Sequence, residues 1–137
     1  MMTDASWNRQ PRSGSQQGCV IAFGDRVREK VHQAPLCIAA WSSTRIERVV
    51  RSTLAAEAAA LANGYDMAVY MRVLLARLLG TTAADWMEQA RSTRQGTCID
   101  CKSLHDMLHK TGGTASEKRT ALDAHDLQQV VGEDGDS

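Results

Sequence analysis

Residues 51–61 read Arg-Ser-Thr-Leu-Ala-Ala-Glu-Ala-Ala-Ala-Leu and open a segment without proline, residues 53–79, in which Ala and Leu dominate. Gly80 follows where a helix C-cap belongs, and Ser52 or Thr53 can cap the start. The apolar residues that recur at three- and four-residue steps are Leu54, Ala58, Leu61 and Tyr65. This spacing predicts an amphipathic helix.

Two short apolar runs precede this helix, at residues 19–23 (Cys-Val-Ile-Ala-Phe) and 36–41 (Leu-Cys-Ile-Ala-Ala-Trp). Turn-forming or charged segments, residues 8–18 and 24–35, bound them, so both runs are predicted to be strands buried on at least one face. Residues 2–7 form a further strand-like piece. Strands joined by loops of this length most simply form an antiparallel meander.

The remainder of the chain alternates between short elements. Residues 95–100 (Gln-Gly-Thr-Cys-Ile-Asp) favour β structure, residues 102–110 favour a brief helix, and a capping box at 114–117 opens a helix to about residue 131. Gly64 is expected to divide the middle segment into two helices. The resulting order, three strands, two helices, a strand and two helices, predicts a mixed α/β fold.

Length and composition limit the class of protein. The chain has 137 residues, of which 43% are hydrophobic, with 16 basic and 16 acidic side chains. These values fit one domain over residues 1–131 with a disordered acidic tail at 132–137, and they exclude a wholly disordered chain. There is no apolar run of membrane-spanning length and no visible signal peptide, so the four cysteines indicate reduced thiols. We expect an intracellular protein, cytoplasmic or nuclear, that does not bind a membrane.

Three carboxylates stand in unusual places. Asp4 lies inside the first strand-like piece, Glu57 lies on the apolar face of the alanine-rich helix, and Asp100 ends a short strand just before a helix. Carboxylates that a fold brings together repel one another, and Mg²⁺ relieves that repulsion. The pattern alone fits a second interpretation equally well, with Glu57 on an exposed helix edge, Asp100 as an N-cap and Asp4 in a frayed terminus.

The blocks around these carboxylates carry a resemblance. Thr-Asp-Ala-Ser-Trp (3–7), the stretch 51–61 quoted above and Asp-Cys-Lys-Ser-Leu-His-Asp (100–106) resemble, in this order, the ribonuclease H domain of copia-type retrotransposon polyproteins. The resemblance extends from about residue 2 to about residue 130. The block Ser-Thr-Leu-Ala-Ala-Glu is quite specific to this branch, whereas Asp-Ala-Ser alone is weak.

The resemblance implies both a fold and an activity. The fold would be a ribonuclease H-like α/β domain, whose mixed sheet has three antiparallel strands and a parallel fourth, with packed helices. Asp4, Glu57 and Asp100 would be the catalytic residues and the ligands of Mg²⁺, or of Mn²⁺. The enzyme would be an endonuclease that hydrolyses the RNA strand of an RNA–DNA hybrid, and the reverse transcriptase portion of the same polyprotein would be a partner.

The sequence departs from the family at both ends. Only residues 1–3 precede the first aspartate, and the family's last strand and helix, with a fourth acidic ligand and a histidine, have no match. A fragment or relic truncated at both ends is therefore expected, with activity impaired by the truncation. Two alternatives remain: a non-catalytic module that binds nucleic acid or protein through the basic first half and the alanine-rich helix, and a relic that barely folds.

The basic residues of the first half are candidates for binding phosphate groups. Residues 1–51 carry 8 Lys and Arg against 4 Asp and Glu, and Arg45, Arg48 and Arg51 recur at three-residue spacing. These arginines either contact phosphates of the hybrid, as the resemblance implies, or form a solvated surface with Glu47.

The remaining candidate ligands are cysteines and histidines. Cys98 and Cys101 lack the second pair that a structural zinc site needs. His105 and His109 share a helix face without a third ligand, which favours ordinary surface histidines.

Overall fold

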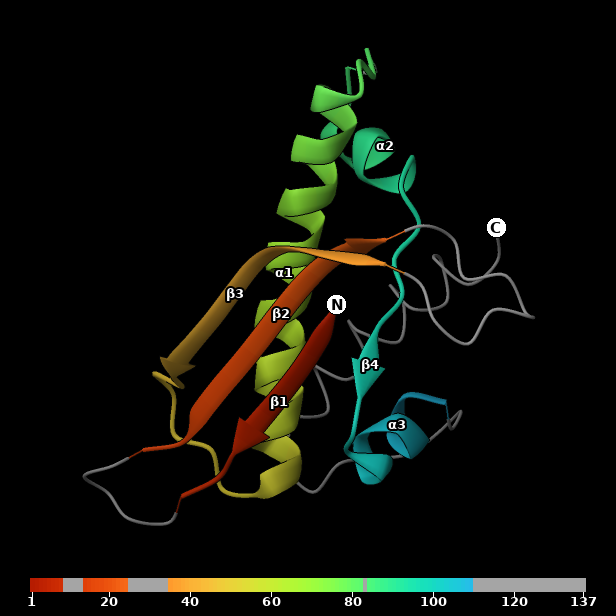
Figure 1. Ribbon diagram of the computed structural model, residues 1–137. Helices are drawn as coiled ribbons and strands as arrows, with labels where there is room; N and C mark the ends of the chain where they lie inside the picture. The colour runs from red at the N-terminus through yellow and green to blue at the C-terminus, as the bar shows by residue number, and fades with distance from the viewer. Residues whose placement is uncertain (9–13, 25–34, 83, 110–137) are drawn as a thin grey trace.

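The computed structural model describes residues 1–8, 14–24, 35–82 and 84–109. Its strands are β1 (Met2–Ser6), β2 (Gln16–Gly24), β3 (Leu36–Arg45) and β4 (Cys98–Ile99), and its helices are α1 (Thr53–Leu78), α2 (Trp86–Arg91) and α3 (Lys102–His109). Figure 1 shows α1 crossing one face of the sheet, α2 beside the C-terminal half of α1, and α3 next to β4. The helix expected at 114–131 and the tail at 132–137 lie outside the described residues.

The four strands form a mixed sheet in the order β3-β2-β1-β4. β1 pairs with β2 and β2 with β3 in antiparallel fashion, and β4 lies parallel to β1. The predicted α/β class and the arrangement of three antiparallel strands with a parallel fourth are therefore confirmed. In the parallel ladder Thr3 lies opposite Ile99, so the next residues on the two strands are Asp4 and Asp100.

The core lies between α1 and the two central strands. Alternate residues of β2, Cys19 and Ile21, are buried against Ala68 of α1. At the first turns of α1, residues 55–60 are all buried, and five of these six side chains are alanine. Small side chains let a helix backbone approach a sheet closely, so this segment brings the start of α1 against β1.

Gly64 shows how close this approach is. A Cβ atom at residue 64 would stand 2.5 Å from Cγ2 of Thr3 and 3.2 Å from Sγ of Cys19. The predicted joint at Gly64 is wrong, because α1 runs unbroken from Thr53 to Leu78. Glycine destabilises a helix interior by only about 1 kcal/mol, and here it makes room for β1 instead of ending the helix.

The edge of the sheet also differs from the prediction. β3 extends to Arg45, and its residues 36–39 are all exposed, so the expectation that the run 36–41 is buried on one face is wrong. The reason is its position, because α1 packs against β1 and β2 while β3 is the edge strand. Trp41 is consequently 73% exposed.

A short helix, α2, follows α1, and the apolar spacing of the sequence did not predict it. It begins after Asp85, whose side chain accepts a hydrogen bond from the backbone N–H of Met87 at 3.1 Å. The short helix predicted at 102–110 is confirmed as α3. Within the described ranges, no helix has both the length and the hydropathy that crossing a bilayer requires.

Candidate metal centre

The three carboxylates singled out from the sequence meet at one point of the fold. Asp4 comes from β1, Glu57 from the second turn of α1, and Asp100 directly follows β4. One carboxylate oxygen from each residue lies within 4.8 Å of the other two. Asp4 and Asp100 are exposed, whereas Glu57 is 6% exposed. The cluster therefore has one buried member, contributed by the helix, and two exposed members at neighbouring strands.

The structure contradicts the second interpretation of the sequence at two of the three carboxylates. Glu57 is not on an exposed helix edge, and Asp4 does not lie in a frayed terminus, because it is paired with Gly18 in the β1–β2 ladder. Both of those alternatives are wrong.

The carboxyl group of Glu57 is in an environment that opposes its charge. Burial is the largest cause that raises its pKa, followed by the negative charge of Asp4; the charge of Asp100 adds a smaller effect. A hydrogen bond from the backbone N–H of Ala5 acts in the opposite direction and lowers the pKa. The net pKa is raised, so burial and the two like charges outweigh the hydrogen bond from Ala5.

The start of α1 is fixed relative to β1 by local contacts. Ser52 is the N-cap, and its side chain accepts a hydrogen bond from the N–H of Ala55 at 3.1 Å. Just before this cap, the carbonyl oxygen of Val50 accepts a hydrogen bond from Nε1 of Trp7 at 3.2 Å. Trp7 directly follows β1 and lies three residues after Asp4, so this bond connects the end of that strand to the segment that leads into α1.

A second set of contacts positions Asp100. Arg72, a buried residue of α1, donates from Nε to the carbonyl oxygen of Thr93 at 2.8 Å and from Nη1 to Oε1 of Gln95 at 3.2 Å. These bonds anchor the segment that leads into β4. On the other side of Asp100, the fully buried Leu104 of α3 packs against Ala58 and Leu61. The sequence analysis missed Arg72, because a single arginine in an apolar helix stretch carries no signal of its partners.

Arg45 ends β3, and Arg48 and Arg51 lie on the connection between β3 and α1. Arg45 and Arg51 are exposed and Arg48 is half-buried. With Trp7 and neighbouring residues they line a hollow of about 680 Å³. The sequence prediction grouped these three residues, and the structure places them on one surface region.

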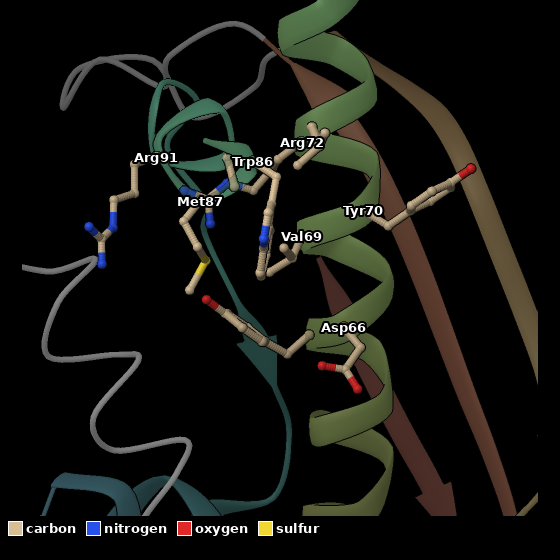
Figure 2. A pocket seen from close by; sticks show the side chains of 10 residues that line it. Asp66, Val69, Tyr70, Arg72, Trp86, Met87 and Arg91 are labelled. Atoms are coloured by element: carbon tan, nitrogen blue, oxygen red, sulfur yellow. The ribbon is translucent and has the colours of Figure 1, made fainter. Parts of the chain in front are cut away.

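A second, more apolar hollow lies elsewhere, between α1 and α2, and the sequence analysis did not predict it. It measures about 610 Å³, and Figure 2 shows Trp86 and Met87 of α2 facing Val69 of α1, whereas Tyr70 points away from them. None of the three clustered carboxylates lines it. Val69 and Val73, four residues apart on α1, line it from the side of that helix.

The donor set of the carboxylate cluster restricts which cation it fits. All three potential ligand atoms are carboxylate oxygens, the type that Mg²⁺ and Mn²⁺ prefer. In the part of the chain that the structure describes, the cysteines join no cluster of three or more potential ligands.

Comparisons with known proteins add no assignment. No protein-family model matches the chain, and neither a curated protein nor a solved structure matches it.

Proposed function

We propose that this chain is a ribonuclease H-like domain that hydrolyses the RNA strand of RNA–DNA hybrids in the presence of Mg²⁺ or Mn²⁺. The observation that supports the proposal is the meeting of Asp4, Glu57 and Asp100 within 4.8 Å, from three segments distant in sequence. These are the positions at which the resemblance to copia-type retrotransposon ribonuclease H domains implies metal ligands. The sheet, with its parallel fourth strand, is compatible with that fold.

The cluster fits a divalent cation on electrostatic grounds. Burial and the charges of Asp4 and Asp100 raise the pKa of Glu57, so bringing positive charge to this point stabilises the ionised form. When bound, such cations activate a water and stabilise the leaving oxygen of a phosphodiester. Asp4 and Asp100 are exposed, so solvent reaches the cluster.

The chain's own residues have separate tasks in this proposal. Asp4, Glu57 and Asp100 hold the cations, and the N–H of Ala5 orients the buried carboxylate. Arg45 and Arg51, both exposed, contact phosphates and thereby position the duplex without selecting a sequence. The alternative of a non-catalytic binding module cannot use residues 55–60 of α1 as a contact surface, because all six are buried.

The test is cleavage of an end-labelled RNA–DNA hybrid by the full chain with Mg²⁺ or Mn²⁺. DNA duplex and RNA duplex of the same sequence serve as substrate controls. Asp4→Asn, Glu57→Gln and Asp100→Asn should each lower the cleavage rate by at least about a hundredfold, since loss of even an outer-shell partner costs 10–100-fold at many metal sites. Asp66→Asn, which removes an exposed carboxylate of α1 outside the cluster, should cleave at the rate of the unmodified chain.

Two results would contradict the proposal in different ways. Salt-sensitive binding of the hybrid without cleavage by the folded chain would indicate the non-catalytic module. Cleavage that persists in all three carboxylate variants would show that the cluster is not the catalytic site.

A further inference from the structure

A second set of potential metal ligands lies on α3, apart from the carboxylate cluster. His105 and His109 are one helical turn apart, and their rings stack with centroids 4.2 Å apart at an interplanar angle of 23°. Both residues are exposed. Two imidazoles at positions i and i+4 of a helix can bind one metal ion together, as in helical zinc motifs. The helix thus presents both rings side by side to solvent.

The Nδ1 atoms of both rings lie near oxygen atoms of α3. Nδ1 of His109 lies 2.9 Å from the carbonyl oxygen of His105, and because that oxygen can only accept, the ring nitrogen donates. In a neutral ring this places the proton on Nδ1 and leaves the lone pair on Nε2. Nδ1 of His105 lies 3.7 Å from a carboxylate oxygen of Asp106. For His109, this is the support that metal-binding histidines have, a hydrogen bond from the nitrogen that does not bind the metal.

The chemistry of this pair differs from that of the carboxylates. Imidazole nitrogen suits Zn²⁺, Ni²⁺ and Cu²⁺, whereas Mg²⁺ prefers oxygen. Among the described residues, Asp4, Glu57 and Asp100 make up the one cluster of three or more ligands, so the histidine pair supplies two protein ligands and water completes the coordination.

We propose that His105 and His109 chelate a divalent transition-metal ion of the Zn²⁺ or Ni²⁺ class and thereby clamp the last turn of α3. A helix of eight residues is marginal by itself, and a bridge between positions i and i+4 stabilises it. α3 contributes the buried Leu104 to the core and begins two residues after Asp100. Binding of the ion therefore stabilises the segment that holds Asp100, whether or not the chain cleaves a hybrid.

The test is a calorimetric titration of the full chain with Ni²⁺, with a thiol-free reductant and excess Mg²⁺ present. The parent for all variants carries His32→Gln and His125→Gln, which removes the other two histidines of the chain. The parent should bind one Ni²⁺, and His105→Ala and His109→Ala should each weaken binding by at least about tenfold. Lys102→Ala, an exposed change on the same helix, should leave Ni²⁺ affinity unchanged.

A second measurement separates chelation from damage to the fold. Ni²⁺ should raise the Tm of the parent and not that of His105→Ala or His109→Ala, while all three should melt alike without Ni²⁺, because both histidines are exposed. The proposal is overturned if the parent binds no Ni²⁺, or if either alanine variant binds it as tightly as the parent.

Discussion

Replacing Glu57 by Gln should stabilise this protein in the absence of divalent cations, although a buried, hydrogen-bonded side chain is changed. The carboxylate oxygens of Glu57 and of its two acidic neighbours lie within 4.8 Å of one another. At that distance two like charges repel by about 0.9 kcal/mol in bulk water and about 3.5 kcal/mol at an effective dielectric constant of 20. Because Asp4 and Asp100 are exposed, the lower value applies, and the two pairs together contribute about 2 kcal/mol.

The hydrogen bond from Ala5 offsets part of this gain. A neutral amide oxygen accepts this bond less strongly than a carboxylate, by about 1 kcal/mol. The net expectation is that Glu57→Gln raises the free energy of unfolding by about 1 kcal/mol at pH 7, which corresponds to a Tm increase of roughly 3–6 °C for a chain of this size. The assay is urea and thermal unfolding in buffer with a chelator.

The stability of the unmodified chain should also depend on pH through Glu57. The pKa of Glu57 is raised above its ordinary value of 4.5, so the folded state binds the proton more tightly than the unfolded state. The destabilisation by Glu57 is therefore absent below pH 4.5 and develops as the pH rises through the folded-state pKa. The stability difference between Glu57→Gln and the unmodified chain should therefore increase as the pH rises from 4.5 to above the folded-state pKa. At pH 7, Mn²⁺ should reverse this difference by stabilising only the unmodified chain. A variant that is less stable at pH 7 without cations would refute this reasoning.

Three further changes test how the site is held and used. Gly64→Ala should lower the free energy of unfolding by about 1–3 kcal/mol despite the better helix propensity of alanine, because its Cβ would meet Thr3 at 2.5 Å; a gain in urea stability would contradict the close contact. Leu104→Ala should cost about 2–5 kcal/mol in the same assay, since this side chain is fully buried, and a loss below about 1 kcal/mol would show that α3 does not pack as described. The double variant Arg45→Ala, Arg51→Ala should weaken hybrid binding and reduce the slope of log K against log salt by about 1 per arginine, whereas an unchanged slope would exclude both as phosphate contacts.

Local patterns in the sequence predicted most of the elements. Apolar runs between turn residues predicted β2 and β3, and the spacing of Leu54, Ala58 and Leu61 predicted α1, because both signals depend only on near neighbours. The exposure of β3 could not be predicted in this way. It depends on which strands α1 covers, and that is a property of the assembled sheet.

The same distinction applies to the carboxylate cluster. The apolar face around Glu57 was visible in the sequence, but its distance from Asp100 depends on the parallel pairing of β4 with β1. That pairing joins segments almost a hundred residues apart and has no local signature. Gly64 was misread for a related reason, because its close contact with Thr3 is invisible from the helix sequence alone.

The central claim, that Asp4, Glu57 and Asp100 together hold divalent cations, is tested most directly by locating Mn²⁺ in crystals of this chain by anomalous diffraction. The account predicts a peak among these three carboxylates and its loss in crystals of the Asp100→Asn variant. A well-ordered carboxylate cluster with no Mn²⁺ peak, at a concentration of Mn²⁺ that supports cleavage, would contradict the account.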